Sequence, residues 1–181
     1  MTREQQLNVA RERDRNDSLA TFRKRFFHDD TDTIYLDGNS LGRMPANVPN
    51  RMNVLLENQW GGRLIRSWNE HWMDLPAATA DGLARLVGAR NDEILVGDST
   101  SINLYKLAFA ALKLQHARSR IVTDSLNFPT DRYILQGLID QHFPEHELVT
   151  VESRDGMTMD MADIRQHLDE SVALVTLSHV A

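Results

Sequence analysis

The second half of the chain alternates short apolar segments with longer amphipathic ones, and this alternation constrains the fold more than any other feature. The apolar segments predict strands, which lie over residues 93–96, 120–122, 147–151 and 172–177. The amphipathic segments predict helices, which lie over residues 101–114, 130–142 and 160–168. Strands that alternate with helices are typical of βαβ crossovers, which build a parallel sheet. We therefore predict an α/β fold with a mainly parallel sheet and helices on both faces.

The first half of the chain is predicted to be mainly helical. Its helices are expected over 3–27, 45–60 and 75–87, with Gly61-Gly62 ending the second and Gly88 the third. Asp17 can cap a second segment within the first helix. A short β-rich run at 33–36 is followed by a loop at 37–42 that contains two glycines and an asparagine. Such residues allow unusual backbone angles, which makes this loop a candidate site.

Composition limits the class of protein. The chain has 181 residues, 41% of them hydrophobic and 25% charged, which is typical of a globular domain. A net charge of -6 argues against a general binder of nucleic acid or anionic membranes. The absence of cysteine excludes disulfides, thiolate catalysis and cysteine-based metal sites. No apolar leader and no apolar run of about 20 residues is present, so we expect a cytoplasmic protein that acts on a small molecule.

No metal site is predicted. The chain has seven histidines but no HExxH motif, and Pro144 interrupts the helix that would align His142 with His146. The acidic run from Asp29 to Asp32 lacks the glycine and the final glutamate of a calcium loop, so we interpret it as a solvated turn. No GxGxxG motif and no P-loop is present either, so dinucleotide and nucleoside-triphosphate sites lack their usual signal.

The loops after the predicted strands are the places to look for a ligand, since ligands of such sheets gather at the carboxyl ends of the strands. Residues 97–101 bring hydroxyl groups to the beginning of a helix, where free backbone N–H groups and the helix dipole favour phosphate. The alternative is that Ser99 or Thr100 is an ordinary N-cap.

The loop over 123–131 follows the next strand and places an aromatic ring and a carboxylate at a helix start. Phe128 suits stacking on a flat heterocycle, and Asp131 suits a ring cation. The alternatives are a hydrophobic staple for Phe128 and a first-turn helix carboxylate for Asp131. Ser178 follows the last strand at the same edge.

Four segments together resemble one enzyme family, the kynureninases. These are Tyr-Leu-Asp-Gly-Asn-Ser-Leu-Gly at 35–42, Ile-Arg-Ser-Trp-Asn at 65–69, Asp-Ser-Thr-Ser-Ile-Asn-Leu at 98–104 and Phe-Pro-Thr-Asp-Arg-Tyr at 128–133. They occur in the family's order and cover the chain from about residue 33 to its end. The resemblance implies a pyridoxal 5'-phosphate (PLP) enzyme with the aspartate-aminotransferase-like fold, PLP fold type I, and a homodimer whose partner subunit contributes to the site.

The resemblance also implies roles for single residues. Thr100 and Ser101 match the phosphate-binding step, and Phe128 matches the ring that stacks on the pyridine. The remaining cofactor-binding residues implied are Pro129, Thr130, Asp131 and Ser178. The residues that lie where the family builds its substrate pocket are Asn39, Ser40 and Trp68. From the residues alone, packing between helices is the favoured interpretation of Trp68.

The implied reaction is the hydrolysis of L-kynurenine, and of its 3-hydroxy form, to anthranilate or 3-hydroxyanthranilate and L-alanine. It belongs to the kynurenine pathway of tryptophan degradation and to NAD biosynthesis. The reaction requires a Schiff-base lysine, but only three of the 20 basic residues are lysines: Lys24, Lys106 and Lys113. None of them matches the family's lysine, which follows a tyrosine and is preceded by an Asp-x-x-His pair.

We therefore expect the Schiff-base lysine beyond Ala181 and no catalytic residue within this chain. On this interpretation the chain is an N-terminal fragment that is inactive alone. Residues 1–60 are an N-terminal helical arm with a substrate-side loop, and residues 61–181 are the truncated first part of the PLP-binding large domain. Two alternatives stay open: a short non-catalytic protein that binds a phosphate ligand or a partner, and a related fold-type-I enzyme such as a desulfurase-like aminotransferase. The motifs at 39–42 and 128–131 favour kynureninase over that relative.

Overall fold

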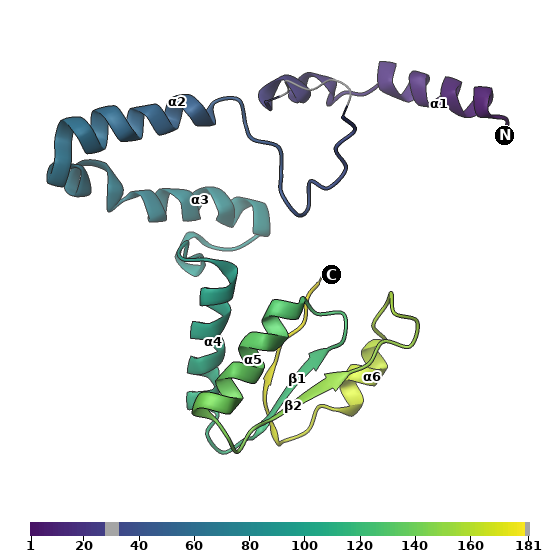
Figure 1. Cartoon of the computed structure of the whole chain (residues 1–181), viewed down its shortest axis with the longest axis vertical. Helices are drawn as coiled ribbons and strands as arrows, with labels where there is room; N and C mark the ends of the chain where they lie inside the picture. The colour runs from purple at the N-terminus through teal and green to yellow at the C-terminus, as the bar shows by residue number, and fades with distance from the viewer. Residues whose placement is uncertain (28–32, 180–181) are drawn as a thin grey trace. The chain divides into compact units, whose positions relative to one another are not determined.

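The computed structural model describes residues 1–27 and 33–179, so the predicted turn at Asp29 to Asp32 lies outside the described residues. The chain divides into two compact units, Met1–Leu75 and Pro76–Ala181 (Figure 1). Within the described part of the chain, no helix has both the length and the apolar character needed to cross a membrane.

The first unit begins with helix α1 (Arg3–Arg15), which is followed by a 3-10 helix, η1 (Ala20–Arg25). Thr2 and Gln5 form a capping box at the start of α1, with each side chain bonded to the other's backbone N–H. The prediction that Asp17 caps the second segment is wrong, because the N-cap residue of η1 is Leu19 and no side chain caps it; the Asp17 carboxylate instead accepts from the backbone N–H of Leu19 at 2.8 Å, in the turn before the helix. The predicted single helix over 3–27 is therefore two helical pieces.

The second helical region of this unit is longer than predicted. Its pieces are α2 (Val48–Asn53), the π-helix η2 (Val54–Gly61), the 3-10 helix η3 (Leu64–Arg66) and the π-helix η4 (Trp68–Trp72). The prediction that Gly61-Gly62 ends the helix is wrong. The backbone stays helical at Gly62, and a Cβ at Gly61 would lie 3.2 Å from the carbonyl oxygen of Leu56. Glycine admits this close approach inside the wide π turn.

The β-rich run at 33–36 forms no strand among the described residues. Ile34 and Leu36 are 84% and 86% exposed, because no neighbouring strand in the described chain pairs with this run. The antiparallel bridge of this unit instead joins Phe26 to Pro45.

Helix α3 (Leu75–Val87) is confirmed, and it ends at Gly88 as predicted, with φ of +71°. The predicted strand at 93–96 is wrong. A turn of 3-10 helix, η5 (Asn91–Glu93), occupies its beginning, and Leu95 is 92% exposed. The Glu93 carboxylate accepts from the backbone N–H of Arg90 at 2.8 Å, which winds the chain where a strand would have to be extended.

Among the described residues, the second unit has one sheet of three parallel strands: β1 (Arg120–Asp124), β2 (Glu147–Val151) and β3 (Val172–Val175). Strand β1 lies in the middle, so the order across the sheet is β2-β1-β3. Val122 at the middle of β1 pairs with Val149 on one side and Val175 on the other. Because all strands run the same way, their carboxyl ends meet at one edge. This sheet confirms the predicted α/β class.

Helices cover both faces of this sheet, as predicted (Figure 1). The helices are α4 (Thr100–Leu114), α5 (Pro129–His142) and α6 (Met161–Gln166). On one face, Leu112 of α4 and Leu138 of α5 pack with Ile121 of β1, and all three are fully buried. On the other face, Ile164 of α6 packs with Val122. The two clusters fix the sheet, and the predicted cofactor residues in the turn from β1 to α5 and after β3 lie at its carboxyl edge.

Candidate cofactor and substrate site

At the start of α4, the hydroxyl groups of Thr100 and Ser101 are available to bind a ligand. Ser99 is the N-cap, because its side chain accepts from the backbone N–H of Ile102 at 3.4 Å. The N-cap alternative therefore applies to Ser99. Among the described residues, the hydroxyls of Thr100 and Ser101 make no hydrogen bond. They lie in the first turn of a 15-residue helix, where unpaired N–H groups and the dipole favour an anion.

The loop before α4 is fixed by side chains of the helix itself. Asp98 has φ of 40°, in the left-handed region that few residues other than glycine adopt. Its carboxylate forms an ion pair with the ammonium of Lys106. Asn103 donates from Nδ2 to the carbonyl of Gly97 at 2.8 Å. A backbone held in a sparsely populated conformation needs such support, and it is common at ligand sites.

The lysines of the second unit have structural contacts. Lys106 pairs with Asp98, and Lys113 lies 5.6 Å from the ring centroids of both Phe109 and Phe143. Cation–ring contacts of this kind anchor an ammonium on an aromatic surface. Neither lysine is presented as a free nucleophile at the start of α4.

The turn before α5 presents an exposed ring. Phe128 is the N-cap residue, and its side chain is 64% exposed. That exposure argues against the hydrophobic-staple alternative, which would bury the ring. Pro129, Thr130 and Asp131 form the first turn of α5, and Asp131 is half-buried. A carboxylate there also interacts favourably with the helix dipole, so the structural alternative for Asp131 is satisfied as well.

Asn127, which the sequence did not single out, is buried at the centre of this edge. Its Nδ2 donates to Oγ1 of Thr123 at 2.9 Å, and its Oδ1 accepts from the backbone N–H of Phe128 at 2.8 Å. Ser178, which follows β3, donates from Oγ to the same Oδ1 at 2.8 Å. Asn127 thus brings two of the predicted cofactor residues, Phe128 and Ser178, into one network. The role of Asn127 could not be predicted from the local sequence, because its partner Ser178 lies 51 positions away.

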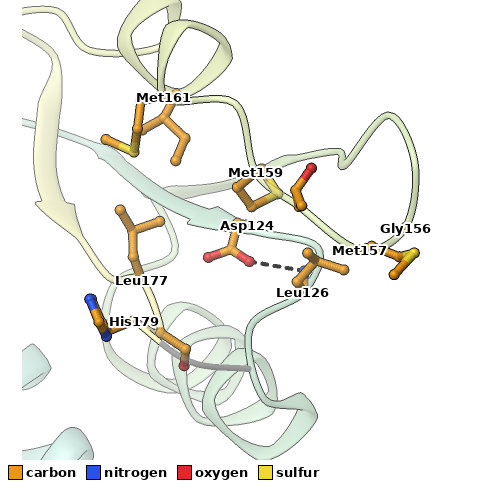
Figure 2. Close-up of a pocket in the computed structure, with 11 residues that line it drawn as sticks. Asp124, Leu126, Gly156, Met157, Met159, Met161, Leu177 and His179 are labelled. Atoms are coloured by element: carbon orange, nitrogen blue, oxygen red, sulfur yellow. Dashed lines mark hydrogen bonds between the residues drawn. The ribbon is translucent and has the colours of Figure 1, made fainter.

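A pocket of about 870 Å³ opens beside this network. Figure 2 shows Asp124 at its centre, with Met159, Met161 and Leu177 around it. Asp124 is 3% exposed, and its carboxylate accepts from the backbone N–H of Leu126 at 2.9 Å. The pocket joins a carboxylate to flexible apolar side chains, and methionines adapt readily to the shape of what they contact.

The loop between β2 and α6 forms one wall of the pocket and is held by Asp155. The Asp155 carboxylate accepts from the backbone N–H groups of Met157 and Thr158 and from the hydroxyls of Thr158 and Ser153. These hydrogen bonds, those from the two backbone N–H groups first, lower the pKa of Asp155 far below its usual range. The loop is also joined to the turn that follows β1, because Ser153 donates its backbone N–H to Oγ of Ser125 at 2.9 Å.

In the first unit, Tyr35 closes the loop that carries two predicted substrate residues. Its hydroxyl lies 2.9 Å from the carbonyl oxygen of Asp37 and 2.6 Å from that of Leu41. Asn39 and Ser40 lie between these two anchor points, and both are exposed. The loop therefore holds its polar side chains toward solvent.

Trp68 lies in a cluster of apolar side chains in the same unit. Its ring meets that of Trp72 edge-on, with centroids 5.5 Å apart, and it is 50% exposed. A pocket of about 410 Å³ is lined by Trp60, Leu64, Ile65, Trp68 and Trp72. Leu64 has φ of 53°, a strained conformation for leucine. Trp68 thus packs against Trp72 and also faces an apolar hollow.

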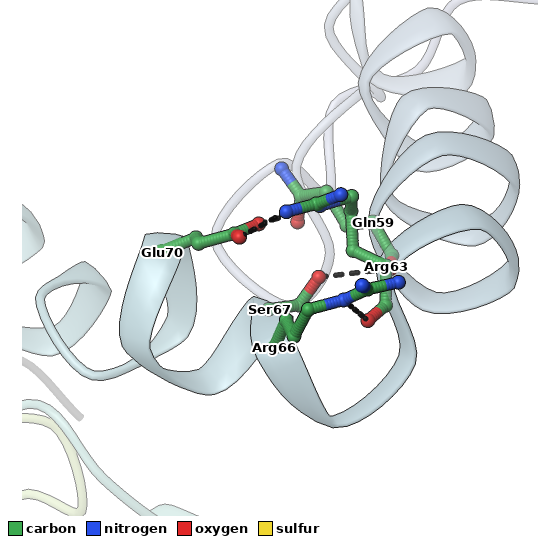
Figure 3. A network of polar contacts seen from close by, with 5 residues as sticks. All are labelled: Gln59, Arg63, Arg66, Ser67 and Glu70. Carbon is green, nitrogen blue, oxygen red and sulfur yellow. Dashed lines mark hydrogen bonds and ion pairs between the residues drawn. The ribbon is translucent and has the colours of Figure 1, made fainter.

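A polar network supports this cluster (Figure 3). Arg63 forms a two-bond ion pair with Glu70, and the hydrogen bond from Arg63 lowers the pKa of Glu70. Ser67 is fully buried and donates to the carbonyl of Gln59 at 2.8 Å. The Trp72 indole N–H donates to Oε1 of the same glutamine at 2.8 Å. These contacts hold the Trp68–Trp72 segment against η2.

The comparisons with known proteins agree with the motifs. The chain is 42% identical to the kynureninase of Pseudomonas fluorescens over 172 residues, which cover 92% of this chain and 39% of that protein. It is also 42% identical to the kynureninases of Burkholderia mallei and Burkholderia pseudomallei over 184 aligned positions, which cover 99% of this chain and 41% of theirs. No family model matches the chain.

This sequence is similar to kynureninases over nearly its whole length. The resemblance inferred from the four motifs is thereby confirmed. The chain spans about two-fifths of the length of the kynureninases that it matches. The parallel sheet with helices is compatible with part of a fold-type-I domain, the fold of kynureninases.

The residues at the start of α4 and in the turn before α5 fit a phosphorylated pyridine in their chemistry. Unpaired hydroxyls of Thr100 and Ser101 at a helix start suit a phosphate, and the exposed Phe128 ring suits stacking. Asp131, in the first turn of α5, has a carboxylate of the kind that can pair with a ring cation. The predicted cofactor residues lie in the second unit, whereas Asn39, Ser40 and Trp68 lie in the first.

Proposed function

We propose that these 181 residues are the N-terminal part of a cytoplasmic kynureninase, which hydrolyses L-kynurenine and 3-hydroxy-L-kynurenine. The products are anthranilate or 3-hydroxyanthranilate and L-alanine, in the kynurenine pathway of tryptophan degradation and in NAD biosynthesis. The observation that carries the proposal is the 42% identity to kynureninases over nearly the whole chain, which includes the residues available at the sheet edge.

In this proposal the start of α4 binds the cofactor phosphate. Ser99 already satisfies the N-cap position, so Thr100 and Ser101 are free to donate their hydroxyl hydrogens to phosphate oxygens. The first-turn N–H groups and the positive end of the helix dipole add to this interaction. Asp98 and Asn103 keep the preceding loop in the conformation that exposes these donors.

The turn before α5 binds the ring of the cofactor. Phe128 stacks on one face of the pyridine, and Asp131 interacts with the protonated ring nitrogen. Pro129 and Thr130 line the same turn, and Ser178 lies beside the phosphate and ring. PLP, when bound, supplies an electron sink for the carbon that loses its proton. The chain's own residues orient that ring.

The first unit supplies the substrate side in this proposal. Residues 1–60 form the helical arm and substrate-side loop, and residues 61–181 form the first part of the PLP-binding large domain. Asn39 and Ser40 offer polar groups to the substrate, and Trp68 offers an aromatic surface for its ring. The complete protein is proposed to be a homodimer, with the partner subunit completing the site.

The lysine that reacts with the cofactor is proposed to lie beyond residue 181. Lys106 and Lys113 are already engaged with Asp98 and with two aromatic rings. An arginine cannot take the role because its guanidinium stays protonated. We therefore expect the reading frame to continue into a segment with Asp-x-x-His and then Tyr-Lys.

The test is to express the complete reading frame that contains these residues, add PLP, and follow the conversion of L-kynurenine to anthranilate and alanine. The double variant Thr100→Val, Ser101→Ala removes both hydroxyls and is expected to weaken PLP binding by at least tenfold, because each hydrogen bond to a charged group contributes roughly 1.5–3 kcal/mol. Thr21→Val, at an exposed position of η1, is the matched control and should bind PLP normally.

A stop codon directly after residue 181 would contradict the proposal and favour a short non-catalytic protein that binds a phosphate ligand or a partner. A complete protein that binds PLP but transfers amino groups or desulfurates cysteine, with no action on kynurenine, would instead favour a related fold-type-I enzyme. Comparing kcat/KM for L-kynurenine and its 3-hydroxy form decides which substrate is preferred.

A further inference from the structure

Asn127 is a buried polar residue whose side-chain amide forms hydrogen bonds both as donor and as acceptor. It is 3% exposed and lies between the end of β1 and the start of α5. Its amide contacts three segments: Thr123 in β1, the backbone of Phe128, and Ser178 after β3. Two longer contacts, at 3.4 and 3.5 Å, join Nδ2 to the hydroxyl and carbonyl oxygens of Thr176. A buried polar group that is satisfied in this way fixes the segments it joins.

These contacts need both a donor and an acceptor on one short side chain. Nδ2 donates to the Thr123 hydroxyl, while Oδ1 accepts from the Phe128 N–H and the Ser178 hydroxyl. Asparagine is the smallest residue with both groups at this spacing. Removing the amide would leave the Phe128 N–H without its acceptor at the start of α5, and an unsatisfied buried donor is costly.

The Phe128 ring depends on this network for its orientation. The ring is 64% exposed, and no ring–ring or cation–ring contact to it occurs among the described residues. The backbone from which this ring extends is held on its N–H side by Asn127. The same oxygen holds the Ser178 hydroxyl.

We propose that Asn127 is a positioning residue that orients Phe128 and Ser178 for the cofactor without touching it. The proposal rests on the proposed function, because it assumes that PLP stacks on Phe128. A well-oriented stacking surface lowers the entropic cost of binding, since fewer conformations have to be excluded when the ligand arrives. Loss of the amide should thus weaken cofactor binding through Phe128.

The test is a double-mutant cycle on the complete protein, with the PLP dissociation constant measured by absorbance and fluorescence titration. Asn127→Ala is expected to raise Kd for PLP about 5- to 50-fold in the wild-type background. In the Phe128→Ala background the same change should raise Kd by no more than the few-fold expected for Ser178→Ala, because only the effect of Asn127 on Ser178 remains. Amide hydrogen exchange of the cofactor-free protein should show faster exchange at Phe128 in the Asn127→Ala variant.

Two further variants keep the test decisive if Asn127→Ala does not fold. Asn127→Asp retains the acceptor oxygen and should keep the exchange rate at the Phe128 N–H close to that of the wild type, whereas Ser178→Ala removes a single bond and should raise Kd by a few-fold. Leu138→Ala controls for general destabilisation, since Leu138 lies in the core cluster away from this network. It should lower the unfolding midpoint and leave Kd unchanged.

The outcomes separate the two proposals. If the wild-type protein binds no PLP, both the proposed function and this inference are wrong. If the wild type binds PLP and Phe128→Ala weakens binding, but Asn127→Ala and Ser178→Ala leave Kd unchanged, only the positioning role is overturned. Equal losses from Asn127→Ala in both backgrounds would also overturn it, since Asn127 would then act independently of Phe128.

Discussion

Replacing Phe128 by alanine should weaken cofactor binding far more than it weakens the fold. The side chain is 64% exposed, so only about a third of its surface is buried in the protein. Full burial of such a side chain contributes about 1.5–3 kcal/mol, which puts the loss of folding free energy at about 1 kcal/mol or less. The ring face that is open to solvent is the part that a stacked pyridine would cover.

The expected effect on binding follows from that open face. An aromatic stacking contact that also buries apolar area contributes about 1–3 kcal/mol, which corresponds to a rise in Kd for PLP of roughly 5- to 150-fold. The assay is a titration of the complete, cofactor-free protein with PLP, together with the thermal unfolding midpoint of the cofactor-free variant. The midpoint should fall by only a few degrees.

The matched control is Tyr133→Ala, which removes another exposed aromatic residue from α5, one that is 74% exposed. We expect this control to bind PLP with the wild-type Kd. An unchanged Kd in Phe128→Ala would refute the stacking role. A large drop in the unfolding midpoint would refute the argument from exposure.

Three further predictions concern the fold and the lysines. Leu138→Ala should destabilise the protein by about 2–5 kcal/mol in urea unfolding, because Leu138 is fully buried, whereas Leu107→Ala, at a 71% exposed position, should change stability little. The pKa of Asp155 is lowered in the folded state. Its carboxylate therefore stabilises the fold above the unfolded pKa, and this stabilisation is lost as the pH falls through the folded pKa. Asp155→Asn should destabilise the protein at pH 7, and the difference in stability between variant and wild type should shrink below about pH 4. The 181-residue chain, mixed with PLP and reduced with borohydride, should show no stoichiometric pyridoxyl-lysine by mass spectrometry; one fully labelled lysine would contradict the assignment of the reactive lysine to a later segment.

The alternation of apolar and amphipathic segments predicted most of the second unit correctly, because buried parallel strands and the helices between them have strong local patterns. The segment at 93–96 has a similar apolar pattern, but a strand also needs a neighbour to pair with. Glu93 instead bonds to the Arg90 backbone and winds a helical turn. Gly61 looked like a helix end, yet it is the residue that allows a close approach to the Leu56 carbonyl within a π turn.

The sequence could single out candidate site residues where one residue carries the chemistry, such as the hydroxyls at the start of α4, and their role in binding stays a prediction. Asn127 was not, because a polar residue in a polar loop is unremarkable until the fold brings Thr123, Phe128 and Ser178 around it. The pocket beside Asp124 likewise depends on methionines of the loop before α6 that only the tertiary structure places there. Long-range contacts of this kind have no local sequence signal.

The most direct test is a crystal structure of the complete protein with PLP bound. We expect phosphate oxygens within hydrogen-bond distance of the Thr100 and Ser101 hydroxyls. We also expect the pyridine to lie parallel to the Phe128 ring at van der Waals distance, about 3.5–4 Å, with Asp131 beside the ring nitrogen. A phosphate bound away from the start of α4, or a pyridine that makes no contact with Phe128, would contradict these expectations.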